Sequence, residues 1–415
     1  MTERFDIVVA GAGMTGATAA LALDAAGFHV ALVDPQPFER QLAPSFDGRA
    51  SAVAYSSFRM LRTLGVGERL EPDACQIEQI LVTDGRSPGA ASGAATPFHL
   101  RFAAEEIADR SGGEPLGYLI ENRRIRAALA EAIQASGVEV LTPARVETVE
   151  VGPAAASVGL ADGRVLEATA VIGSEGRESG IRRLAGIDVV GWRYGQSGVV
   201  ATVRHERPHG GVAYEHFLPG GPFAILPLTD DRASLVWTEP TRRAEALAEA
   251  SDAAFEAHLR RRFGDFLGGT SVEGPRFTYP LGLQLAERWT APRVALLGDA
   301  AHAIHPIAGQ GLNLGLKDVA ALAETLADAA RRGEDIGAEA VLERYAAWRR
   351  FDTVGLALAT DAFTRLFSND IAPVRLLRGL GVAAVNRIGP ARRFFMAEAG
   401  GAVGDLPRLL RGLPV

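Results

Sequence analysis

Two short apolar runs, each followed by a glycine-rich turn, stand out in the pattern of hydrophobic and polar positions along the chain. They cover residues 5–10 (FDIVVA) and 293–297 (RVALL). A mainly apolar run of this length, followed by glycine, is typical of a strand buried in a parallel sheet. Between the two runs, residues 194–239 alternate apolar and polar positions, which predicts a mostly antiparallel sheet.

Helical patterns follow both apolar runs. Residues 17–27 form a small-residue helix that ends at Gly27, and a second strand follows over residues 29–33. Downstream, a helix with one apolar face begins near Gly311, and the chain becomes helical again from about Glu343. The order of strands and helices predicts an α/β (α+β) fold, in which a Rossmann-like domain carries an inserted antiparallel sheet and a C-terminal helical segment.

Length and composition narrow the possible classes of protein. A chain of 415 residues is too long for one ordinary core and suggests at least two domains. The net charge of −7 argues against nucleic-acid binding. The single cysteine, Cys75, excludes an intramolecular disulfide and cysteine-based metal sites, and it favours a reducing cytoplasm. We expect no signal peptide, because the N-terminal residues MTERFDIVVAGAGMTG carry acids early and run straight into a strand and turn, and no membrane-spanning helix, because no run of 18 apolar residues is present.

The turn after the first strand, GAGMTG, fits the dinucleotide pattern G-x-G-x-x-G. Gly11 allows the tight turn, Gly13 lets the backbone approach a pyrophosphate, and Gly16 lets helix and strand pack closely. Asp34 lies 18 residues after Gly16, where a carboxylate would accept hydrogen bonds from an adenosine ribose. The motif therefore predicts a dinucleotide site, with a turn that binds nothing as the alternative, and it does not separate FAD from NAD.

The turn after the second apolar run, residues 298–313 (GDAAHAIHPIAGQGLN), allows three interpretations. A serine-type triad lacks its nucleophile motif, G-x-S-x-G. A metal site built from Asp299, His302 and His305 lacks any known ligand spacing, so we expect no metal. The third interpretation is a flavin cradle, in which Asp299 accepts hydrogen bonds from ribityl hydroxyls and a helix N-terminus faces the electron-rich ring.

Residues 298–318 (GDAAHAIHPIAGQGLNLGLKD) resemble the signature of the FAD-dependent aromatic hydroxylases of ubiquinone (coenzyme Q) biosynthesis. These enzymes belong to the flavoprotein monooxygenases with the p-hydroxybenzoate hydroxylase fold. The resemblance extends over roughly residues 5–355 through FDGRASAVAYSS (46–57), YLIENRRIRAAL (118–129), YGQSGVVATV (194–203), GPFAILPL (221–228) and ERYAAWRRFD (343–352). It implies FAD as cofactor, NAD(P)H as transient reductant, and O2 and a polyprenylated phenol or quinone precursor as substrates.

The resemblance also implies a role for each matching position. The glycine loop would hold the pyrophosphate, Val146 would lie near the adenine, and Asp299 would bind the ribityl chain. The implied cofactor-binding set is Gly11, Gly13, Met14, Thr15, Gly16, Asp34, Pro35, Arg49, Asn122, Arg123, Val146, Glu175, Gly298, Asp299, Pro306, Gly309, Gln310, Gly311, Leu312 and Asn313.

One position departs from the family pattern. The wider group carries Asp-Gly at the end of a strand, whereas this chain has Glu175-Gly176. The charge is kept and the side chain is one carbon longer. Glu175 would either contribute to pyrophosphate or NAD(P)H handling, or simply occupy a polar turn.

The mechanism that the resemblance implies is ring hydroxylation, in which NAD(P)H reduces FAD, dioxygen forms a C4a-hydroperoxide and the phenol ring attacks its distal oxygen. A base that ionises the phenol would help, and Tyr214 and His216 in AYEHF are candidates, with packing or hydrogen bonding as the alternative. Two other functions stay open: a flavin-fold subunit that organises a quinone-biosynthesis complex without turnover, and a flavin hydroxylase of another aromatic compound.

These patterns divide the chain into three parts. The FAD-binding domain is expected at 1–75, 106–182 and 283–345, the substrate domain at 76–105 and 183–282, and the C-terminal helical segment at 346–415. Residues 371–415 carry seven arginines and two acidic residues. Such a basic amphipathic segment would dock on the inner face of a membrane or on subunits of a quinone-biosynthesis complex, or else pack on the protein's own body.

Overall fold

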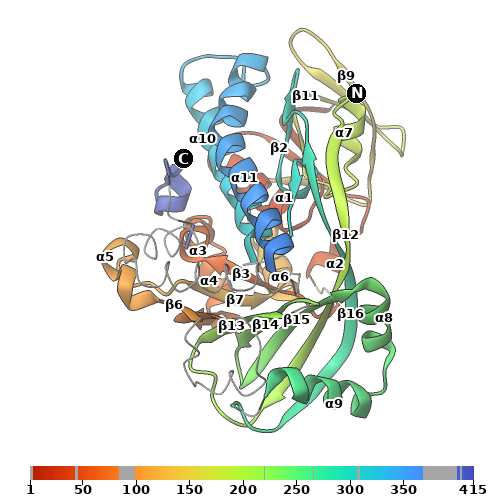
Figure 1. Cartoon of the computed structure of the whole chain (residues 1–415). Helices are drawn as coiled ribbons and strands as arrows, with labels where there is room; N and C mark the ends of the chain where they lie inside the picture. Colours follow the sequence, from red (N-terminus) through yellow and green to blue (C-terminus); the bar gives the residue numbers. More distant parts are fainter. Residues whose placement is uncertain are drawn as a thin grey trace.

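The computed structural model describes residues 3–42, 45–83, 99–218, 220–264, 266–305, 309–367, 400–401 and 404–415. Figure 1 shows a helix-covered parallel sheet in the upper half of the molecule and a broad antiparallel sheet in the lower half. This arrangement confirms the predicted fold class.

The parallel sheet is built around the first apolar run, which forms strand β1 (Glu3–Ala10). Its strand order is β17-β18-β11-β1-β2-β8, and β1 pairs in parallel with both of its neighbours. The second apolar run forms β18, one strand away from β1, so both glycine turns lie at the same edge of the sheet. The bounds are β2 (Val30–Val33), β8 (Glu139–Leu141), β9 (Val146–Val151), β10 (Ala156–Leu160), β11 (Val165–Gly173), β17 (Thr290–Ala291) and β18 (Val294–Leu296).

Helices cover this sheet as the small-residue pattern predicts. Helix α1 (Met14–Ala25) packs against α6 (Asn122–Gln134) and α10 (Gln310–Arg331), and α10 packs against α11 (Glu339–Phe367). Alanine and glycine dominate the buried surface of α1, which lets the neighbouring backbones approach closely. The shorter helices are α2 (Glu39–Leu42), α3 (Tyr55–Thr63), α4 (Gly67–Leu70), α5 (Ala108–Ser111) and α7 (Gly180–Leu184).

The antiparallel sheet has the strand order β19-β16-β12-β15-β14-β13-β5-β6, and its one parallel pair joins β13 to β5. Two strands of 17 residues each, β12 and β16, run along both halves of the molecule (Figure 1). The bounds are β5 (Gln79–Thr83), β6 (His99–Ala103), β12 (Val189–His205), β13 (Val212–Leu218), β14 (Gly221–Leu228), β15 (Arg232–Pro240), β16 (Thr270–Ala286) and β19 (His302–Ala303).

The two faces of the antiparallel sheet pack against different layers. On one face, Phe223 and Trp237 pack with helices α8 (Thr241–Glu249) and α9 (Asp252–Phe263). On the other face, Ala213 and Leu228 pack with residues of a small three-stranded sheet. That sheet consists of β3 (Ala50–Ala54), β7 (Gly117–Glu121) and β4 (Cys75–Ile77), and it joins the two halves of the molecule.

The C-terminal residues 404–415 pack on the protein's own body. Leu409 and Leu410 are buried in the main core, and Arg408 forms ion pairs with Glu324 and Asp328 of α10. The other arginines of the predicted docking segment, except Arg411, fall between residues 371 and 399, outside the described residues. Across the described ranges, no helix is both long and apolar enough to cross a membrane.

Candidate functional site

The glycine loop between β1 and α1 is closed by backbone packing. Gly11 has a φ of +102°, and a Cβ atom there would lie 2.7 Å from the carbonyl oxygen of Ser174. A Cβ atom on Gly16 would lie 1.9 Å from the carbonyl oxygen of Gly11. Gly13 differs, because in the part of the chain that the structure describes no atom outside its chain neighbours would lie within 4 Å of its Cβ. The first and third glycines are therefore needed by the fold, and the second leaves space at the N-terminus of α1.

Asp34 connects the end of β2 to this loop. Its two carboxylate oxygens accept hydrogen bonds from the backbone N–H groups of Ala12 (2.7 Å) and Gln36 (2.8 Å). Each oxygen keeps a further lone pair, so the carboxylate can also accept from a ribose hydroxyl. Val146 begins β9 in a buried position, and Pro35 is exposed next to Asp34.

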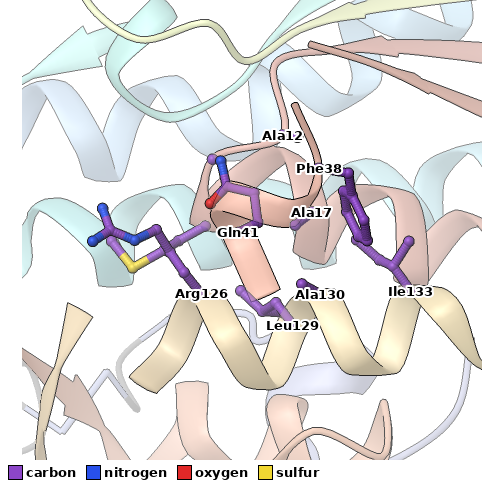
Figure 2. A pocket seen from close by; sticks show the side chains of 10 residues that line it. Ala12, Ala17, Phe38, Gln41, Arg126, Leu129, Ala130 and Ile133 are labelled. Carbon is purple, nitrogen blue, oxygen red and sulfur yellow. The ribbon is translucent and has the colours of Figure 1, made fainter. Parts of the chain in front are cut away.

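A small pocket opens beside the loop, between α1, α2 and α6 (Figure 2). It encloses about 200 Å³, including its open mouth, and Phe38, Gln41 and Arg126 contribute to its wall. In the part of the chain that the structure describes, the buried Nε atom of Arg126 has no hydrogen-bond acceptor. Sequence reasoning missed this cation, although it lies one helical turn after Asn122 on α6.

The predicted cofactor contact Arg49 is held by a neighbouring carboxylate. Its guanidinium donates to Asp47 (2.7 and 3.0 Å) and lies over the ring of Tyr279, 5.0 Å from its centroid. Arg126 approaches the same carboxylate at 3.3 Å. Burial opposes ionisation of Asp47, yet the hydrogen bonds and charges of the two arginines lower its pKa below the usual value.

Asn122 and Arg123 organise the same segment. The side-chain oxygen of Asn122 accepts from the Ser51 hydroxyl at 2.7 Å, and its backbone N–H donates to the carbonyl of Arg49. Arg123 pairs with Glu121 at 2.9 Å and lies over the ring of Phe46. Both residues hold the segment after α2 in place.

Glu175 turns toward helix α7. Its carboxylate accepts from the Ser179 hydroxyl (2.9 Å) and from the backbone N–H of Ile181 (2.7 Å). A carboxylate at this end of the helix satisfies a free N–H group and complements the helix dipole. The geometry favours the polar-turn interpretation of Glu175, and a role in cofactor handling stays a prediction.

The two glycine turns meet at Thr15. A Cβ atom on Gly298 would lie 3.2 Å from the Thr15 side chain, and one on Gly315 of α10 would lie 2.8 Å from its hydroxyl. Next to Gly298, the Asp299 side chain is 49% exposed and lies 3.7 Å from Arg177. The structure therefore brings together the two predicted half-sites and leaves Asp299 accessible.

A buried ionic network lies beneath the second turn. Asp318 accepts from His302 (2.5 Å), from Arg349 (3.2 Å) and from the backbone N–H of Gly298 (3.1 Å). Burial raises the pKa of Asp318, but the interactions with His302 and Arg349 and the hydrogen bond from Gly298 outweigh it and lower the pKa overall. His302 therefore anchors the loop.

The second histidine of the loop is also buried. His305 packs edge-to-face on Tyr194, with ring centroids 5.2 Å apart, and burial lowers its pKa to about 4. It is neutral at pH 7. Within the described ranges, no group of three or more His, Cys, Asp or Glu residues is placed to hold a metal.

The N-terminus of α10 contacts β3 through Asn313. Its amide accepts from the N–H of Ala54 (2.9 Å) and donates to the carbonyl of Ala52 (2.8 Å), as a neighbouring strand would. Gly309 precedes the helix with a φ of +62°, and a Cβ there would lie 3.1 Å from Ala52. Among the described residues, a Cβ atom on Gly311 would have no atom within 4 Å beyond its chain neighbours and its own helix, so Gly311 faces open space. Gln310 is buried, Leu312 is half-buried, and the predicted contact Pro306 lies outside the described residues.

The two catalytic candidates face the helix layer. Tyr214 packs on Phe266, and His216 stacks near Phe223, in the cluster that contains α9. The Nδ1 atom of His216 lies 2.6 Å from the Thr83 hydroxyl, and burial lowers its pKa to about 4. This face is opposite the one that packs on β3 and β7, which favours the packing interpretation; their catalytic role stays a prediction.

The chain matches the FAD binding domain family over residues 4–353. It is 44% identical over 414 residues to ubiquinone hydroxylase UbiL of Rhodospirillum rubrum, an alignment that covers 99% of this chain and 93% of that protein. It is 34% identical to 3-demethoxyubiquinol 3-hydroxylase of Escherichia coli, covering 94% and 96%. Among solved structures, p-nitrophenol 4-monooxygenase PnpA of Pseudomonas putida DLL-E4 has a TM-score of 0.78 at 20% identity, covering 96% and 98%, and shares the fold.

The geometry of the site fits FAD. Open space lies at the N-termini of two helices, beside Gly13 and Gly311, and these termini favour anionic groups. The buried Arg126 nitrogen supplies a donor for a negatively charged group on the glycine-loop side. Asp34, beside the glycine loop, and Asp299, in the second turn, supply acceptors for hydroxyl groups of the cofactor.

Two glycine substitutions separate folding from cofactor binding. Gly16→Ala places a methyl group against the Gly11 carbonyl, so we expect the free energy of unfolding to fall by about 3 kcal/mol or more. Gly13→Ala has room in the cofactor-free protein and should keep its melting temperature while weakening FAD binding. Thermal unfolding of the apoprotein and FAD titration by fluorescence test both, and equal melting temperatures for the two variants would contradict the assignment.

The buried network predicts a second stability effect. Arg349→Met removes the arginine partner of the buried Asp318 carboxylate, so we expect the free energy of unfolding to fall by about 3–5 kcal/mol. Arg350→Met, at the exposed neighbouring position, is the matched control and should change stability by about 0.5 kcal/mol or less. Urea unfolding measures both variants, and similar midpoints would show that the network adds nothing.

Proposed function

Because the chain belongs to the FAD binding domain family, we propose that it is a flavoprotein monooxygenase that hydroxylates the aromatic ring of a polyprenylated phenol or quinone precursor in ubiquinone biosynthesis. NAD(P)H is the reductant and O2 the co-substrate. The near-full-length similarity to a ubiquinone hydroxylase carries this proposal.

The residues of the chain divide the work of holding the cofactor. N–H groups at the start of α1 and the guanidinium of Arg126 bind the pyrophosphate, and Asp34 accepts from the adenosine ribose. Asp299 accepts from ribityl hydroxyls, and the N-terminus of α10 at Gly311 stabilises negative charge on the reduced ring. When bound and reduced, FAD supplies the activated oxygen. The face of the antiparallel sheet that carries Ala213 and Leu228 and is turned toward β3 and β7 positions the substrate ring and excludes water.

Product analysis under labelled oxygen tests the proposed reaction. Purified holoprotein, NADPH or NADH, and a phenol with a short prenyl chain should yield a hydroxylated phenol that carries one 18O atom from 18O2, detected by mass spectrometry. The phenol with its ring positions blocked by methyl groups is the control and should give no such product. Failure of NAD(P)H to reduce the flavin under any condition would contradict the proposal and favour a subunit without turnover.

We further propose that residues 371–399 dock on an anionic membrane surface, because the prenyl tail of the substrate partitions into lipid and five arginines lie in this segment. Truncation is a poor test, because Leu409 and Leu410 belong to the main core. Replacing Arg387, Arg392 and Arg393 by Gln should instead reduce sedimentation with phosphatidylglycerol vesicles several-fold, with FAD content unchanged. Replacing Arg260 and Arg261 of α9 is the control, and equal loss in both variants would contradict a specific role for the segment.

A further inference from the structure

One carboxyl group lies in an otherwise apolar row that crosses the antiparallel sheet. Residues that pair directly across neighbouring strands point to the same face. The strand pairings give the row, in order across the sheet, as Val82, Glu215, Ala224, Val236, Val200 and Phe277. Glu215 is its one polar member.

Val200 and Phe277, the last two members of this row, face a segment that is expected to contact the cofactor. A Cβ atom on Gly48 would lie 2.7 Å from the ring of Phe277 and 3.6 Å from Val200. Gly48 lies between Asp47 and Arg49, in the segment that approaches the glycine loop through Arg126. The row is therefore on the face of the sheet that is turned to the FAD-binding half.

On the same face of the sheet, contacts lead from the neighbourhood of Glu215 to the start of α10. Ala213, which shares the face of Glu215 two positions earlier on β13, packs in one apolar cluster with Ala52 of β3. A Cβ atom on Gly309, at the start of α10, would lie 3.1 Å from Ala52. Glu215 thus lies on the side of the sheet that is turned toward Gly309 and the start of α10, whereas Tyr214 and His216 point to α9.

The surroundings of Glu215 leave its carboxyl group unused. Its side chain is half-buried, and across the described ranges it forms no hydrogen bond or ion pair. Burial alone raises its pKa to about 8. A carboxyl group with this pKa retains base strength near neutral pH, which suits a proton acceptor.

Other titratable groups on this face have partners elsewhere. Arg232, four residues before Val236 on β15, pairs with Glu121 and Glu273. Tyr279, two residues after Phe277 on β16, donates to the carbonyl of Asp47. Tyr55 of α3 lies in the apolar cluster with Ala213. None of these groups contributes to the pKa of Glu215, so its titration follows from burial.

We propose that the Glu215 carboxylate accepts the hydroxyl proton of the phenol substrate, an inference that rests on the function proposed above. In this step the phenol O–H bond breaks and a carboxyl O–H bond forms. The bonding electron pair stays on the phenol oxygen and increases the electron density of the ring carbon that receives the oxygen atom, which makes this carbon a stronger nucleophile. The apolar neighbours of Glu215 hold the ring, and the carboxylate orients its hydroxyl group.

The pH dependence of hydroxylation tests this role. With the short-chain prenylated phenol, product formation by wild-type holoprotein should rise with pH and level off above an apparent pKa near 8. In Glu215→Gln this rise should disappear, and kcat above pH 8 should fall about 100-fold, because a general base contributes roughly that factor or more. FAD content and the rate of flavin reduction by NAD(P)H should be unchanged.

Two further variants complete the experiment. Glu215→Asp should keep the rise with pH at a reduced rate, and Glu245→Gln, an exposed carboxyl on α8, should match the wild type. Unchanged rate and pH profile in Glu215→Gln, with an active wild type, would overturn the role of Glu215 alone. An inactive wild type would overturn the proposed function as well. Loss of FAD in both Glu215 variants would show a structural role and also overturn the inference.

Discussion

Close backbone contact around Thr15 is the constraint on which the site depends. Gly298 and Gly315 both lie against this side chain, and Gly16 lies against the Gly11 carbonyl, so glycine is needed at each contact. These contacts bring the N-termini of α1 and α10 toward the same space, although the two helices are almost 300 residues apart in the chain. Two partial positive charges then face one region, and an elongated anionic dinucleotide can use both. The buried Asp318 network holds the second turn in this position.

Glycine spacing and apolar runs were sufficient to predict this convergence. The sequence indicated two parallel strands, and the carboxyl ends of such strands meet at one edge of a sheet. No spacing pattern in the sequence indicated the side-chain contacts that hold the second turn at this edge of the sheet. Asp318 lies 16 residues from His302 and 31 from Arg349, and these intervals match no local periodicity. Arg126 lies within the matched segment 118–129, but its proposed role follows from how α6 packs beside the glycine loop.

The alternation of apolar and polar residues also did not show which layer of the protein covers each face of the antiparallel sheet. A period of two places Tyr214 and His216 on one face of β13 and Glu215 on the other, but the covering layer of each face is decided by tertiary packing. Two polar residues of the family motifs make hydrogen bonds within the fold: Asn313 accepts from the N–H of Ala54 in β3, and Glu175 accepts from the N–H of Ile181 in α7. The motif therefore combines two kinds of position. Gly13, Gly311 and Asp299 face open or accessible space, whereas Gly11, Gly16 and Asn313 make close contacts within the fold.

Glu215 is the position where the requirements of folding and of chemistry conflict. An apolar side chain would suit its row better, because burial opposes ionisation of the Glu215 carboxyl and raises its pKa from 4.5 to about 8. Between pH 4.5 and about 8, the folded protein therefore keeps a proton on Glu215. Over that window the unfolded chain binds fewer protons, so the free energy of unfolding falls as the pH rises. Departures from a locally consistent design are expected at functional sites. The cofactor half of the site is built mainly from backbone and helix ends, whereas the proposed role of Glu215 depends on one carboxyl group in an apolar row of the sheet face turned toward it.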